Sequence, residues 1–178
     1  MMTRTYLTIG MVLVAAGAVL HAATASLRIV PTVRDDAVIV SVEMADAYTD
    51  EVREAIASGL RTTFTYELEL KMDVPAWADR TIATASVTVS DNYDTLTRVH
   101  NLARMVDGRV EEAIVTSNET QARQWLTTLT RVPLCKTSRL DPHREYYVRI
   151  SASVRPPGSS LLGWASAVTN QAKFTFIP

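Results

Sequence analysis

Residues 64–72 read FTYELELKM and show the clearest periodicity in the chain. Apolar side chains stand at the even-numbered positions, and threonine, glutamate or lysine stands between them. Because successive side chains of a β-strand point to opposite faces, this alternation predicts a strand with one buried and one solvated face. Half-buried strands are typical of antiparallel sheets, so the stretch favours an antiparallel β domain.

Further strand signals recur on both sides of this stretch. Between two of them lies the dipeptide Asp107-Gly108, which predicts a two-residue hairpin turn. In total we expect about eight strands. Apart from residues 64–72, the segments with strand character are residues 27–31, 37–42, 83–89, 102–106, 109–115, 146–154 and 172–176.

Two segments have helical rather than strand periodicity. Thr49 is a suitable N-cap, and a second helix capped by Ser117 is expected to end before Pro133. The pattern predicts an α+β domain, mainly antiparallel β and sandwich-like, with two short helices packed on an end or face. The apolar sides of the two helices are expected to carry Val52, Ile56 and Leu60 in the first, and Ala122, Trp125, Leu126 and Leu129 in the second.

Composition narrows the class of protein. The chain has 178 residues, of which 47% are hydrophobic and 21% charged, values that are ordinary for a folded protein. After the N-terminal segment, residues 26–178 are long enough for a single β-rich domain. The net charge is −1, and the chain has only three lysines, with arginines scattered along it. We therefore expect that the protein does not bind DNA or RNA.

The first 25 residues have the composition of a secretion signal. Arg4 is their one charge, an apolar run follows from Tyr6 to Leu20, and Ala23-Thr24-Ala25 has the small residues that a signal peptidase requires. We expect cleavage after Ala25 and a periplasmic protein. The alternative is that the segment stays uncleaved and anchors the domain to the inner membrane.

Four segments, spread along the whole domain, carry a family resemblance: residues 49–60, 106–113, 145–149 and 172–178. In order and spacing they resemble the bacterial domain of unknown function 4390 family. The resemblance implies a proteobacterial exported protein whose gene often stands beside a nitrogen-regulation type sensor histidine kinase. It therefore implies a periplasmic role in envelope signalling, with a membrane sensor kinase as a candidate partner, and the family has no established activity to carry over.

Motifs for enzyme chemistry are mostly absent from the sequence. The best remaining group is Asp141, His143 and Glu145, which in an extended segment would point to one side and could act as metal ligands or acid/base groups. We favour a solvated turn at Pro142 instead. We accordingly expect no metal, no cofactor and no enzymatic activity, and an enzyme that uses these three residues is kept as an alternative.

Two polar features have a functional and a structural interpretation. Cys135, the only cysteine, could be an activated thiol, but a lone cysteine among apolar neighbours is more often a small buried hydrophobe. With one thiol the domain has no internal disulfide and depends on its hydrophobic core. His100 with Arg98 and Arg104 could meet an acidic partner, but we interpret these positions as the solvent side of a strand.

Apolar features also allow two interpretations. Trp77 could contact a partner, although we expect it in the core at a strand connection. The row Tyr66, Leu68 and Leu70 could line the pocket of a carrier for an apolar ligand, but a sandwich core explains the same row.

The leading contact candidates are Leu161, Leu162 and Trp164, an apolar cluster between Pro156-Pro157-Gly158 and the last strand. Such side chains on a loop contact a membrane surface or a protein, or fold back as a lid. We therefore expect a non-enzymatic periplasmic interaction or accessory domain with a protein partner. Membrane contact is expected only through the N-terminal segment or the loop around Trp164.

Overall fold

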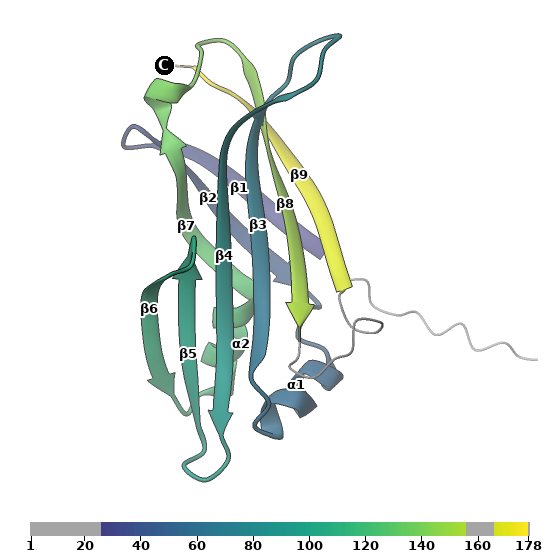
Figure 1. Ribbon diagram of the computed structural model, residues 1–178, viewed down its shortest axis with the longest axis vertical. Helices are drawn as coiled ribbons and strands as arrows, with labels where there is room; N and C mark the ends of the chain where they lie inside the picture. The colour runs from purple at the N-terminus through teal and green to yellow at the C-terminus, as the bar shows by residue number, and fades with distance from the viewer. Residues whose placement is uncertain (1–25, 156–165, 178) are drawn as a thin grey trace, which may run out of the picture.

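The computed structural model describes residues 26–155 and 166–177. Within these ranges the chain forms two antiparallel β-sheets, two α-helices and one short 3-10 helix (Figure 1). The elements are β1 (Ser26–Arg34), β2 (Ala37–Ala45), α1 (Asp50–Ala57), β3 (Thr62–Met72), β4 (Arg80–Asp94), β5 (Val99–Val106), β6 (Arg109–Thr116), α2 (Glu119–Thr127), β7 (Thr128–Lys136), η1 (Thr137–Arg139), β8 (Glu145–Arg155) and β9 (Ser166–Thr175).

The larger sheet has six strands in the order β6-β5-β4-β3-β8-β9. Its centre is β3, where Phe64, Tyr66, Leu68 and Leu70 are buried while Glu67 is exposed, as the alternation predicts. The strands on both sides continue this buried face, because Leu68 lies opposite Ala85 on β4 and opposite Ile150 on β8. One face of the sheet thus forms half of the core.

The smaller sheet, in the order β1-β2-β7, supplies the other half of the core. On β2 the side chains of Val38, Val40, Val42 and Met44 are buried. Figure 1 shows β1 and β2 crossing behind β3, β8 and β9, so two sheets face each other across one apolar layer. The mainly antiparallel, sandwich-like α+β fold is confirmed, with nine strands in the described residues instead of about eight.

The first helix begins where the sequence predicts and ends earlier. Thr49 is the N-cap of α1, its hydroxyl accepting from the Val52 backbone N–H. At the other end Gly59 has φ +80°, and the Leu60 N–H donates to the Ala55 carbonyl, which is a Schellman termination. The helix therefore stops before Leu60, which is exposed rather than part of the helix's buried face.

The second helix differs more from its prediction. Its N-cap is Asn118, not Ser117, and the Asn118 side chain accepts from the Gln121 N–H. The chain turns from helix into β7 at Thr128, so Leu129 is buried in a strand. β7 is an edge strand that pairs only with β2, and at such an edge Pro133 is tolerated opposite Ile39.

Two turns of the six-stranded sheet have different characters. Asp107 and Gly108 form the predicted two-residue β5–β6 turn, with φ values of 48° and 78° that suit a type I′ turn. The β3–β4 connection is longer and extends beyond the neighbouring strands at the end of the molecule away from α1 (Figure 1).

Candidate functional site

The β3–β4 loop, residues 73–79, holds Trp77 in solvent. The residue is 81% exposed, and its backbone N–H donates to the Val74 carbonyl at 3.1 Å in a tight turn. Ala76, just before it, has φ +63°, a left-handed conformation that costs a non-glycine residue free energy. The turn thus directs a large aromatic side chain away from the core.

Polar contacts fix this loop to the sheet. The Tyr147 hydroxyl on β8 donates to the Asp79 carboxylate at 2.6 Å. The Lys173 ammonium on β9 pairs with the Asp73 carboxylate at 2.9 Å, and the Asp73 N–H donates to the Glu145 carbonyl. Both ends of the loop are therefore attached to neighbouring strands, and the loop that carries Trp77 is pre-organised.

These contacts also shift the pKa values of three of the side chains that make them. The hydrogen bond from Tyr147 holds the pKa of Asp79 below its usual value. Burial and the Asp79 contact raise the pKa of Tyr147, and the Asp73 contact raises the pKa of Lys173. At neutral pH the Asp79 carboxylate is therefore ionised and the Tyr147 hydroxyl is protonated, which are the states that keep this contact.

A cleft of about 410 Å³ lies at the other end of the molecule, between α1, the β4–β5 turn and the start of α2. It is open to solvent and combines aromatic, acidic and basic side chains. Its lining residues are Tyr48, Arg53, Glu54, Ile56, Ala57, Tyr93, Arg98, His100, Ser117 and Glu119.

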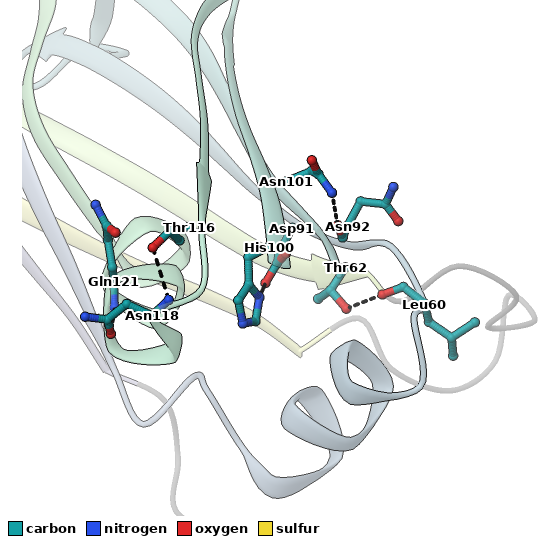
Figure 2. Close-up of polar contacts among 9 residues, drawn as sticks. All are labelled: Leu60, Thr62, Asp91, Asn92, His100, Asn101, Thr116, Asn118 and Gln121. Atoms are coloured by element: carbon teal, nitrogen blue, oxygen red, sulfur yellow. Dashed lines mark hydrogen bonds and ion pairs between the residues drawn. The ribbon is translucent and has the colours of Figure 1, made fainter. Parts of the chain in front are cut away.

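The floor of this cleft contains a buried acid–base pair. The Asp91 carboxylate on β4 lies 2.7 Å from Nδ1 of His100 on β5, and the two side chains are 0% and 7% exposed. The second Asp91 oxygen, Oδ1, is buried and has no hydrogen-bond partner among the described residues. In Figure 2 one edge of the His100 ring meets Asp91, and the opposite edge faces the space between α1 and the start of α2. A ring nitrogen of His100 is thus offered to whatever enters the cleft.

Two tyrosines surround this pair. The Tyr93 ring centroid lies 4.7 Å from that of His100, with the planes tilted by 46°. Burial raises the pKa of Tyr48, and the negative charges of Glu119 and Asp91 raise it further. The Tyr48 hydroxyl therefore stays protonated and neutral at physiological pH.

Comparison with protein families gives one result. A family model described as "Domain of unknown function (DUF4390)" matches residues 22–156. The chain belongs to the DUF4390 family. No curated protein and no solved structure matches it.

In this DUF4390 protein the interpretation of a solvated face is wrong for His100 and Arg104 and holds only for Arg98. His100 and Arg104 share the core-facing side of β5 with buried Leu102. The Arg104 guanidinium lies 4.3 Å from the centre of the Trp125 ring on α2. Arg98 is separate from them, exposed in the β4–β5 turn with φ +58°.

The expectation that Trp77 fills the core is also wrong, because the loop turns it outward. Pro75 and the loss of alternation after residue 72 are the sequence signals for this turn. The Asp91–His100 pair was missed as well, although Asp91 continues the odd-numbered buried positions of β4 at Val87 and Val89.

Asp141, His143 and Glu145 do not share one extended segment, because only Glu145 belongs to a strand, as the first residue of β8. His143 lies in a turn with φ +59°, and all three residues are exposed, so strand geometry does not direct them to one side. Cys135 is half-buried against the core, and burial raises the pKa of its thiol. That shift is opposite to the one an activated thiol needs.

Of the remaining candidate binding residues, one group lies in the core and the other lies outside the described residues. Tyr66, Leu68 and Leu70 are at most 1% exposed, and the Tyr66 hydroxyl donates to the Leu126 carbonyl at 2.6 Å, so the row packs within the core. The leading contact candidates, Leu161, Leu162 and Trp164, lie outside the described residues. None of the helices in the described part of the chain has the length and apolarity needed to cross a membrane.

Proposed function

We propose that this protein is a non-enzymatic interaction domain of the periplasm, and that a partner protein docks on the loop that carries Trp77. The observation that carries the proposal is the 81% exposure of a tryptophan on a loop attached at both ends. Tryptophan is among the residues that contribute most to binding free energy at protein interfaces. A loop fixed before binding also loses less conformational entropy on association.

The charges around Trp77 favour a protein over a lipid surface. Asp79 lies two residues after the tryptophan, and its lowered pKa keeps its carboxylate ionised at neutral pH, whereas the charge of Asp73 is already balanced by Lys173. Carboxylates are repelled by anionic phospholipids, whereas a protein partner can present complementary cations. We therefore expect a partner with basic side chains around an apolar pocket.

The proposed setting is envelope signalling. The signal-like residues 1–25 support export, with cleavage after Ala25 or retention as an inner-membrane anchor. Either form places the domain where the extracytoplasmic part of a membrane sensor kinase could meet it.

Site-specific crosslinking tests the proposal. A photo-crosslinking amino acid replaces exposed Ala78 in the cell, in the otherwise native chain and in a Trp77→Ala background. We expect a discrete protein adduct that the Trp77→Ala change abolishes while the melting temperature stays unchanged. The matched control is Leu96→Ala, because Leu96 is 92% exposed on the β4–β5 turn at the opposite end of the molecule.

Three results would contradict this function. One is an adduct that persists without Trp77. Another is Trp77-dependent binding to vesicles of phosphatidylethanolamine and phosphatidylglycerol, which would assign the loop to the membrane. The third is loss of the adduct in Trp164→Ala but not in Trp77→Ala, which would move the contact to residues 161–164.

A further inference from the structure

We propose that the cleft beside His100 binds a primary ammonium group, presented by a free amine or by a lysine side chain. This site lies at the opposite end of the molecule from Trp77 and is independent of the proposed docking loop. Three features of the cleft carry the inference: the orientation of His100, the balance of charges and the two tyrosines.

His100 offers an electron pair to the cleft. Its bond to the Asp91 carboxylate assigns the proton to Nδ1, so Nε2 is the acceptor in the neutral ring. Nε2 has no hydrogen-bond partner among the described residues, although the side chain is only 7% exposed. Such an acceptor at the floor of a cleft suits a ligand that donates hydrogen bonds.

The surrounding charges favour a cation. Glu54 on α1 and Glu119 on α2 line the cleft, and Asp91 lies beneath it. The cations facing it are Arg98 and Arg53, but the Arg53 guanidinium is already 2.7 Å from the Asp50 carboxylate. Counted with Asp50 and with Arg123, whose guanidinium lies 5.8 Å from the centre of the Tyr48 ring, carboxylates still outnumber guanidinium groups around His100, by four to three, so a positively charged ligand gains electrostatic energy there.

The aromatic lining narrows the class of cation. Tyr48 and Tyr93 both border the cleft, and aromatic rings attract organic ammonium groups more readily than they replace the water shell of a metal ion. Among residues 26–155 and 166–177 no three histidine, cysteine or acidic side chains come together to hold a metal. An ammonium group, with N–H donors for Nε2 and a charge for the carboxylates, fits this cleft.

The test follows the His100 ring nitrogens by NMR in the ¹⁵N-histidine-labelled protein. The amine probes are n-butylamine and the peptide acetyl-Gly-Lys-Gly-amide, and the acidic control is acetyl-Gly-Glu-Gly-amide. We expect the amine probes to shift the Nε2 resonance of His100 in a saturable way and the acidic peptide to leave it unchanged. A response to both amine probes identifies a general amine site, and a response to the peptide alone identifies a lysine side chain as the ligand.

Surface variants keep the test independent of the buried pair, whose replacement could unfold the protein. Glu119→Gln should weaken amine binding by about two- to fivefold, and Arg98→Gln should strengthen it by a similar factor, as expected for exposed charges. The matched control Glu111→Gln, on exposed β6 outside the cleft lining, should leave the dissociation constant unchanged.

The opposite pattern would overturn the inference. A His100 response to the acidic peptide, with weaker binding in Arg98→Gln, would show a carboxylate site. Absence of any saturable shift with either amine would show that the cleft does not bind ammonium groups.

Discussion

Cys135 lies on β7 opposite Val38, and its thiol is half-buried against the core. Burial raises the pKa of the thiol, and the charge of Arg139 only partly offsets this. Because the thiolate is the reactive form, we expect Ellman's reagent to react several-fold more slowly with the folded protein than with the protein in urea. Equal rates in the two states would show that the thiol is neither shielded nor shifted.

The hydroxyl of Tyr147 is expected to control the mobility of the Trp77 loop. In Tyr147→Phe the Asp79 carboxylate loses its donor, and its pKa should return toward the usual value for aspartate. We expect faster hydrogen exchange at the Val74 amide, which donates to Asp79. The Ser86 amide, which donates to Asp107 in the β5–β6 turn, serves as the control and should keep its protection.

This contact has a defined pH dependence. The pKa of Asp79 is lowered in the folded state, so the contact is fully present above the unfolded-state value of about 3.9 and is lost as the pH falls through the lowered value. Val74 protection, corrected for intrinsic exchange, should therefore be constant near neutrality and fall only in acid. A change between pH 6 and 8 would contradict the assignment to Asp79.

At the scale of elements, β3 allows a test with two adjacent positions. Leu68 is buried between Ala85 and Ile150, whereas Glu67 is exposed and accepts from the Ser86 hydroxyl at 2.9 Å. Leu68→Asp buries an unpaired carboxylate and should cost several kcal/mol, which is enough to unfold a small domain. Glu67→Lys removes one surface contact and should shift the melting temperature little. Similar melting temperatures for the two variants would contradict the register of β3.

Short sequence patterns correctly predicted the strands, caps and turns that depend only on neighbouring residues. The alternation in residues 64–72 gave the correct buried face, Thr49 was the correct cap, and Asp107-Gly108 was the correct turn. The transition from α2 to β7 was missed because Leu129 fits either a helical face or a strand. Pairing with β2 decides between them, and that partner is some 90 residues away in the sequence.

The candidate sites were less predictable than the fold, since each depends on contacts between distant residues. Trp77 is positioned by Tyr147 and Lys173, which follow it by many residues. Asp91 and His100 meet only because the β4–β5 hairpin places Tyr93 opposite His100. The sequence showed that Asp91 falls on the buried face of β4, but it did not show the pairing register that brings His100 to it.

At the scale of the whole molecule, β9 is expected to be indispensable although the family match ends at residue 156. β9 pairs along β8 and contacts β1, where the Asn170 side chain donates to the Leu27 carbonyl. Deleting residues 156–178 exposes the buried edge of β8 and removes Phe176 from the core. We expect this variant to lose its cooperative thermal transition in circular dichroism. A truncated protein that melts like the full chain would show that β1 to β8 suffice.

The meeting of β1 with β9 also sets when the protein can fold. Leu27 and Asn170 are 143 residues apart, and contacts of such high sequence separation slow folding because a long loop must close first. The sandwich cannot be completed until β9 has been synthesised and can reach β1. The same topology that closes the native sheets therefore delays their closure until both ends of the domain, β1 and β9, are available to meet.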